Sequence, residues 1–283
     1  MQTAPGMGKA RGYLKLLRLG NCAMGALGAL LAAVVCVSDV DQLPDYASQI
    51  TYSMIVVIAF TAAGNSLNDY FDREVDKVAH PDRPIPSGIV NPPEAVNVAV
   101  LFFAIALILA VLVNVWSFLI VVTSLFVMVG YEAFLKAEGL AGNLAISWLT
   151  GALFLFGGSA VDSLELAWIL AALAFLATLG REIVKDIQDI EGDKGSRLTL
   201  PMRIGVRKAG IIGSASFAAA VALSPVPYLL DLLSFWYVPV VVAADAIFIY
   251  CALIHFRDPV RGQKVAKLAM LVALIAFLVG GVL

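Results

Sequence analysis

Two groups of three aspartates have the same spacing along the chain, three residues and then four. The groups are Asp69, Asp72 and Asp76, and Asp186, Asp189 and Asp193. On an α-helix of 3.6 residues per turn, these offsets bring three side chains within about 60° of one another. Each group therefore predicts a stripe of carboxylates on one face of a helix.

Three like charges on one helix face repel, so a cationic partner is expected. Mg²⁺ suits such oxygen ligands, because it binds through one or two carboxylates together with phosphate oxygens of a substrate. Two stripes on the same side of a protein would clamp one diphosphate through bridging metal ions. Nearby basic side chains would hold the remaining phosphate charge; they are Lys77, Arg83, Arg181 and Lys185.

Other ion and nucleotide sites find no support in the sequence. The aspartates do not follow the twelve-residue pattern of an EF-hand calcium loop, and no Walker-type glycine loop is present. Cys22, Cys36 and Cys251 lie in apolar stretches without metal-ligand spacing, and His80 and His255 are far apart. Mg²⁺ is therefore the expected cofactor.

The elements that carry the stripes are expected to be membrane helices. Hydrophobic residues make up 61% of the chain and charged residues 14%, against about 45–50% and about 25% in soluble domains. A span needs about 20 apolar residues, and nine continuous runs qualify: 16–37, 47–68, 94–113, 115–134, 141–161, 164–186, 209–227, 233–255 and 265–283. The sequence predicts an all-α polytopic membrane protein, with residues 1–283 in a single membrane-embedded domain.

The charges predict an orientation. In a nine-span topology all Lys and Arg residues, 19 in number, fall on one side of the membrane. The opposite connections hold only acids, namely Asp39, Asp41, Asp45, Asp162, Glu165 and Asp231. The positive-inside rule then places the N-terminus and both stripes in the cytoplasm and the C-terminus outside.

Asn68 directly precedes the first stripe, and the pattern Asn-Asp-x-x-Asp-x-x-x-Asp together with the second stripe resembles the UbiA superfamily of intramembrane prenyltransferases. The resemblance covers the whole chain. It implies a nine-helix bundle with both motifs on the cytoplasmic side, and a reaction in which a prenyl diphosphate donor meets an acceptor inside the bilayer. It implies that Mg²⁺ is held by Asn68, Asp72, Asp76, Asp186, Asp189 and Asp193.

Within the superfamily, residues 72–88 and 180–186 look most like an archaeal group. That group transfers a geranylgeranyl group to the hydroxyl of geranylgeranylglyceryl phosphate and so builds the second ether bond of archaeal lipids. Quinone precursors, haem and chlorophyll are alternative acceptors on the same scaffold. A secondary transporter is an alternative from another class, although its coupling sites usually lie at the membrane midplane.

The resemblance also adds substrate-binding residues outside the stripes. They are Arg18 and Asn21 on the first span, and Tyr131 and Lys136 after the fourth. Asn143 and Ser147 on the fifth span are weaker candidates. An acceptor phosphate would need its own basic partner, for which Lys136, Arg203 and Arg207 are available. The expected partners are the prenyl donor, a lipid-like acceptor and the bilayer; neither a nucleic acid nor a protein partner is inferred.

One acid has no place in this scheme. Asp245 lies inside the eighth expected span, and acids within the membrane are often functional. The sequence leaves open whether Asp245 is a structural hydrogen-bonding residue or part of a site.

Overall fold

The computed structural model describes residues 8–37, 39–193 and 197–283, and within these ranges it contains helices and no strand. The α-helices are α1 (Lys9–Leu17), α2 (Leu19–Cys36), α3 (Ala47–Phe71), α4 (Arg73–Ala79), α5 (Pro92–Val113), α6 (Val115–Ala133), α7 (Leu140–Ala160), α8 (Leu164–Gln188), α9 (Ile190–Asp193), α10 (Leu200–Ile204), α11 (Val206–Leu223), α12 (Val226–Leu229), α13 (Tyr237–Ile254) and α14 (Pro259–Val282). Two 3₁₀ helices are η1 (Val40–Tyr46) and η2 (Leu135–Ala137).

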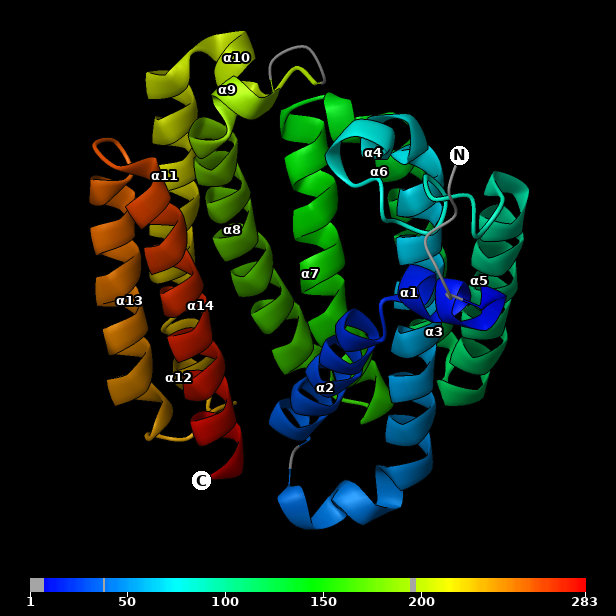
Figure 1. Cartoon of the computed structure of the whole chain (residues 1–283). Coiled ribbons are helices and arrows are strands. Elements are labelled where there is room, and N and C mark those ends of the chain that lie inside the picture. Colours follow the sequence, from blue (N-terminus) through cyan, green and yellow to red (C-terminus); the bar gives the residue numbers. More distant parts are fainter. Residues whose placement is uncertain (1–7, 38, 194–196) are drawn as a thin grey trace.

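Among the described residues, nine helical stretches are long and apolar enough to cross a membrane, which confirms the expected number. The chain is a multi-pass membrane protein. The stretches are α1 with α2, η1 with α3, α5, α6, α7, α8, α11 with α12, α13 and α14. Figure 1 shows them side by side in one bundle, with the short helices α4, α9 and α10 at one end and the C-terminus at the other.

The first span differs from the expected run 16–37, because helix begins earlier and is broken in the middle. Arg18 separates α1 from α2 and takes up a left-handed backbone conformation, φ 51° and ψ 62°. The break leaves the backbone carbonyl of Leu17 without its helical N–H partner. The side-chain amide of Asn65 donates a 2.9 Å hydrogen bond to this carbonyl. In Figure 1, α1 lies across the bundle while α2 runs along it.

Close helix packing holds the middle of the bundle together. α2 contacts both α3 and α7, and Gly157 on α7 permits this approach. A Cβ atom at Gly157 would lie 2.4 Å from the Cβ of Ala32 on α2. Small residues at crossings are how membrane helices come close enough for van der Waals packing. This packing sets the distance between the helices that carry the site.

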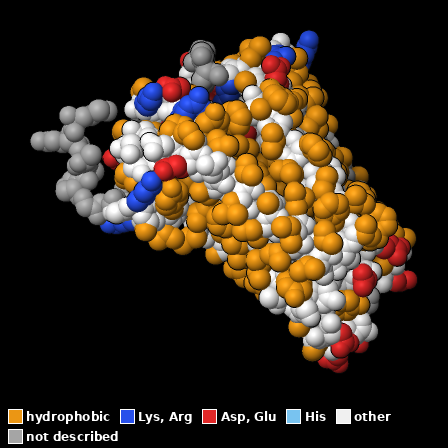
Figure 2. Space-filling model, turned by 90° about the vertical axis from the view of Figure 1, so that its right-hand side faces the viewer, with side chains coloured by type: hydrophobic (Ala, Val, Ile, Leu, Met, Phe, Trp, Pro, Cys, Tyr) orange, Lys and Arg blue, Asp and Glu red, His pale blue; other side chains and the backbone are white. Residues whose placement is uncertain are grey.

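The outer surface follows the expected charge pattern. Figure 2 shows apolar side chains along the bundle, Lys and Arg at one end of the face in view, and only acids at the other end. Lys194, which also contributed to the orientation argument, lies outside the described residues.

Candidate active site

The first acid motif lies on a helix that continues through Asp72 from α3 into α4. The backbone N–H of Asp72 donates to the carbonyl of Asn68 at 2.9 Å, and that of Asp76 donates to the carbonyl of Asp72 at 2.8 Å. The i to i−4 pattern is therefore kept, and the three acids share one face. Asp69 and Asp76 are buried, while Asp72 between them is partly exposed.

The second acid motif is built in the same way, on α8 and α9. The N–H of Asp189 donates to the carbonyl of Lys185 at 2.9 Å, and that of Asp193 donates to Asp189 at 2.9 Å. Asp186 and Asp193 are buried, and the middle acid, Asp189, is partly exposed. The two motifs thus match in backbone path and in burial, as their equal spacing predicts.

Two arginines from different parts of the chain compensate the buried acids of the first motif. Arg18, at the break in the first span, forms an ion pair with Asp69. Arg83, in the loop after α4, lies 2.5 Å from Asp76 and 3.7 Å from Asp69. Buried carboxylates need such partners, because an unpaired charge in a protein interior is costly. The sequence-predicted residues Arg18 and Arg83 therefore do meet the first stripe.

Lys136 binds the middle acid of this stripe, together with a residue that the sequence analysis did not single out. Its Nζ lies 2.7 Å from both carboxylate oxygens of Asp72 and 3.3 Å from Glu132. Asn68 donates to both oxygens of Glu132 at 3.1 Å and to Asp72 at 3.1 Å. Glu132 is buried in the last turn of α6; an acid inside an apolar span, four residues before a lysine, was the available signal.

The second motif has its own partners. Asn143 on α7 donates to Asp186 at 2.9 Å, which gives a role to a residue that the sequence offered only as a weak candidate. Arg197 lies 2.8 Å from Asp193 and was not predicted. Ser147 is buried and donates to the carbonyl of Asn143 at 2.6 Å, a bond within its own helix.

A small polar cavity joins the two motifs. Its lining includes Lys136, the partner of the first stripe, and Asp186 of the second stripe, together with Tyr131, Asn143 and Arg197. The volume is about 20 Å³, room for about one water molecule. The two stripes, more than a hundred residues apart in sequence, therefore lie at the same end of the bundle (Figure 1), where Lys136 and Asp186 meet in one cavity.

An apolar cavity of about 400 Å³ leads away from this polar region between α2, α3, α6 and α7. Its polar wall contains Arg18, Asn68, Tyr131 and Glu132, and Tyr131 lines the small polar cavity as well. Its apolar walls include Val56, Phe60, Val121, Leu149, Leu153 and Phe156. We call this space the first apolar cavity. It offers a long apolar chain a place beside the acids.

Two predicted basic residues of the second motif pair with a neighbouring acid instead of a stripe. Glu182 is buried on α8, forms an ion pair with Arg181, and lies 3.7 Å from Lys185. Glu182 and Lys185 both line the small polar cavity, so they still belong to the region between the stripes. The sequence analysis did not predict Glu182.

Asn21 and Lys77 are not brought to the stripes by the structure. Asn21 is exposed near the start of α2. Lys77 is exposed and binds Glu74 at 2.6 Å, and this hydrogen bond lowers the pKa of Glu74 below its ordinary value. Glu74 itself is exposed, as expected for a residue between the acids that points off their common face.

The donor set suits Mg²⁺ only together with a substrate. Among the described residues, no three His, Cys, Asp or Glu side chains lie close enough together to hold a metal ion by themselves. The oxygen ligands are present, but cations of the chain pair with the three acids of the first stripe and with Asp193 of the second. Mg²⁺ commonly completes its shell with phosphate oxygens, so the residues fit a metal that arrives with a diphosphate.

Known proteins resemble this chain over most of its length. The model of the UbiA prenyltransferase family matches residues 22–278. A protein of Methanococcoides burtonii named digeranylgeranylglyceryl phosphate synthase is 42% identical over 95% of this chain and 99% of its own length.

Two solved structures share the fold. One, described as giving insights into the biosynthesis of digeranylgeranylglyceryl phosphate synthase in membranes, has a TM-score of 0.89 and 32% identity over 98% of this chain and 99% of that one. The other, a UbiA homologue from Archaeoglobus fulgidus bound to GPP and Mg²⁺, has a TM-score of 0.72 and 17% identity over 95% and 98% of the two chains. The chain belongs to the UbiA prenyltransferase family.

Proposed function

We propose that this protein transfers a geranylgeranyl group from its diphosphate to the hydroxyl of geranylgeranylglyceryl phosphate, forming the second ether bond of an archaeal membrane lipid. Relatives that match nearly the full length are named for this product, and family membership leaves no place for the transporter alternative. The observation that carries the proposal is the polar cavity shared by Lys136 and Asp186, which brings the two acid motifs together beside an apolar cavity.

Mg²⁺ would be held by Asn68, Asp72, Asp76, Asp186, Asp189 and Asp193. When bound, the metal neutralises the diphosphate and stabilises it as a leaving group. Asp69 lies deepest in the first stripe, 2% exposed and paired with Arg18; its role is to position Arg18 beside the cavity. A magnesium-bound relative of the same fold supports a divalent ion here.

The basic residues of the chain would hold the phosphate oxygens of the donor. Arg18, Arg83 and Lys136 bind the carboxylates of the first stripe, while Arg181 and Lys185 lie with Glu182 beside the second. The small polar cavity has no room for a diphosphate, so these cations turn from carboxylates to phosphate when the donor and its metal bind. Tyr131, between the two cavities, would lie against the allylic end of the chain.

The reaction then breaks the bond between the first prenyl carbon and the diphosphate oxygen. The hydroxyl oxygen of the acceptor forms the new C–O bond, diphosphate leaves with both bonding electrons, and the hydroxyl proton passes to the departing diphosphate. The first apolar cavity holds the prenyl chain and keeps water from the cationic carbon. Asn21 and Lys77, both exposed, would act only at the entrance.

The proposal also assigns the active site to one side of the membrane. The charge pattern supports a cytoplasmic N-terminus and active site and an outer C-terminus. The whole chain, residues 1–283, acts as one membrane-embedded domain. Its partners are the prenyl donor, the lipid acceptor and the bilayer.

The test is a reaction of the purified protein with labelled geranylgeranyl diphosphate, Mg²⁺ and one acceptor at a time. We expect a product with the mass of digeranylgeranylglyceryl phosphate and an equal amount of diphosphate. Prenylation of an aromatic acid, but not of geranylgeranylglyceryl phosphate, would overturn the acceptor assignment. Release of no diphosphate with any acceptor would overturn the reaction itself.

A further inference from the structure

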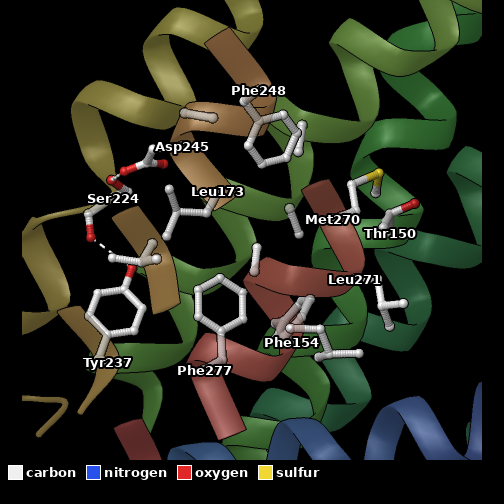
Figure 3. Close-up of a pocket in the computed structure, with 16 residues that line it drawn as sticks. Thr150, Phe154, Leu173, Ser224, Tyr237, Asp245, Phe248, Met270, Leu271 and Phe277 are labelled. Carbon is white, nitrogen blue, oxygen red and sulfur yellow. Dashed lines mark hydrogen bonds between the residues drawn. The ribbon is translucent and has the colours of Figure 1, made fainter. Parts of the chain in front are cut away.

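A second apolar cavity, of about 270 Å³, lies on the other side of α7 from the first, between α7, α8, α11, α13 and α14. Leu149 and Leu153 of α7 line the first apolar cavity, whereas Thr150 and Phe154 line the second. Figure 3 shows its walls, formed by side chains such as Leu173, Phe248 and Phe277. The two cavities share no lining residue, so the second is a space of its own.

Among the described residues, one acid, Asp245, lines this mostly apolar space. The Oγ of Ser224 donates to Oδ2 of Asp245 at 2.7 Å, and Figure 3 shows the other carboxyl oxygen on the side away from Ser224. Within the part of the chain that the structure describes, Asp245 accepts a hydrogen bond from Ser224 alone. Asp245 lies midway along α13, a membrane span, where a polar group without a partner is costly.

The hydroxyl groups of Tyr237 and Thr150, which also line the cavity, donate hydrogen bonds to backbone carbonyl groups. Tyr237 donates to the carbonyl of Ser224 at 2.7 Å, and Thr150 donates to the carbonyl of Ile146 at 3.0 Å. They therefore offer a ligand no proton, and no Lys, Arg or His side chain lines the described walls. An anionic head group would find no cation here. A pure hydrocarbon would leave the second oxygen of Asp245 without a partner.

The cavity can be reached from the bilayer. Leu271, on α14, is 54% exposed and also lines the cavity. Since α14 spans the membrane, this exposed side faces lipid. An entering molecule would come from the hydrocarbon region and would have to carry its polar group on an apolar chain.

We propose that the second apolar cavity binds the hydroxyl end of an uncharged long-chain alcohol from the bilayer, with the hydroxyl hydrogen-bonded to Asp245. A hydroxyl group can donate a hydrogen bond, so it supplies the donor that the second carboxyl oxygen of Asp245 lacks. The chain of the alcohol packs against the aromatic and aliphatic walls. The site is independent of the acid stripes and of the reaction proposed for them.

Geranylgeraniol and its methyl ether are a matched pair of probes, because the ether keeps the chain and the oxygen but has no proton to donate. Equilibrium binding of each to the purified full-length protein in non-ionic detergent measures the preference for a hydroxyl. We expect geranylgeraniol to bind about tenfold more tightly, the effect of about one hydrogen bond to a carboxyl group. Equal binding of the two probes would overturn the proposal.

Substitutions assign the preference to the second apolar cavity. Asp245→Leu should abolish it, while Asp162→Asn, which removes an acid outside the cavity, should keep it. If Asp245→Leu does not fold, Asp245→Asn is tested instead. Its side-chain amide donates to the ether as well as to the alcohol, so the difference in affinity between the two probes should become smaller. A preference that survives in the folded variant would place the alcohol elsewhere and overturn the proposal.

Discussion

The side chain of Lys136 holds Asp72 through both carboxylate oxygens, each 2.7 Å from its Nζ. Asp72 belongs to the first stripe, whereas Lys136 comes from η2 and lines the polar cavity with Asp186 of the second. The Lys136–Asp72 ion pair therefore lies between the first motif and the cavity that Asp186 of the second motif lines. Because a donor with its metal would bring both a cation for Asp72 and an anion for Lys136, we expect this ion pair to separate when the donor binds.

The middle acids of both stripes should be required for turnover. Asp72→Ala and Asp189→Ala remove partly exposed carboxylates, so the protein should stay folded while the rate falls at least about a hundredfold, as when a transition-state stabilising group is lost. Initial rates and thermal unfolding in detergent check this. Glu74→Ala is the control, since Glu74 is exposed and pairs with Lys77. Near-normal rates in both aspartate variants would contradict the two-stripe clamp.

Metal binding should depend on the donor. Without diphosphate, Asp69, Asp72 and Asp76 are compensated by cations of the chain, so Mg²⁺ alone should bind weakly. Titration calorimetry with Mg²⁺ should show little heat until an unreactive thio-analogue of the donor is present. A chelator should abolish turnover without lowering the unfolding temperature of the substrate-free protein. Tight Mg²⁺ binding by the free protein would contradict this order.

The sequence predicts the spans and the stripes well, because apolar length and helical spacing are local properties. It does not reveal the helix break at Arg18, because position 18 is neither a glycine, which favours a left-handed backbone, nor a proline, which interrupts helices. It also misses Glu132 and Arg197, whose meaning depends on contacts across the fold with Asn68 and Asp193. Helical periodicity could have predicted that Lys77 is exposed. The sequence alone could not show whether Lys77 pairs with Glu74 or with an aspartate of the first stripe.

Lys136→Met should weaken binding of the donor. The sequence alone favours an acceptor phosphate for Lys136, but its contact with Asp72 favours the donor. The substitution keeps the apolar stem and removes the charge, so the KM for geranylgeranyl diphosphate should rise more than the KM for the acceptor. Steady-state kinetics with each substrate varied in turn decide it. A larger rise for the acceptor would return Lys136 to the acceptor phosphate.

Arg207→Met is the matched substitution for the acceptor. Arg203, the other candidate, already lies 2.5 Å from Glu138, whereas Arg207 is exposed at the start of α11. If Arg207 serves the acceptor phosphate, its loss should raise the KM for geranylgeranylglyceryl phosphate alone. An unchanged KM for both substrates would leave Arg207 as a charge that only orients the chain in the membrane.

The proposed orientation can be tested by labelling single cysteines. Asp41 and Lys208 are exposed at opposite ends of the bundle, and the native cysteines, Cys22, Cys36 and Cys251, are buried. In sealed vesicles, an impermeant thiol reagent should reach a cysteine at position 41 from outside and one at position 208 only after lysis. The sequence also predicts Gly195 as a cytoplasmic position for a label, but Gly195 lies outside the described residues. Labelling of both positions from the same side would contradict the nine-span orientation.

The ion pair between Arg18 and Asp69 should stabilise the fold as well as the site. Asp69 is only 2% exposed, and without Arg18 its nearest described cation is Arg83, at 3.7 Å. Breaking a buried pair by removing one partner costs about 3–5 kcal/mol, because the remaining charge is left uncompensated; Arg83 and the partial exposure of Arg18 should hold the loss at or below the lower end of this range. Arg18→Ala should therefore lower the unfolding temperature in detergent. Adding Asp69→Asn to Arg18→Ala removes the stranded charge and should restore part of the stability, though not the activity. If the double variant is no more stable than Arg18→Ala, the loss came from the left-handed backbone at position 18, and Arg18→Gly, which suits that backbone, should then unfold later than Arg18→Ala.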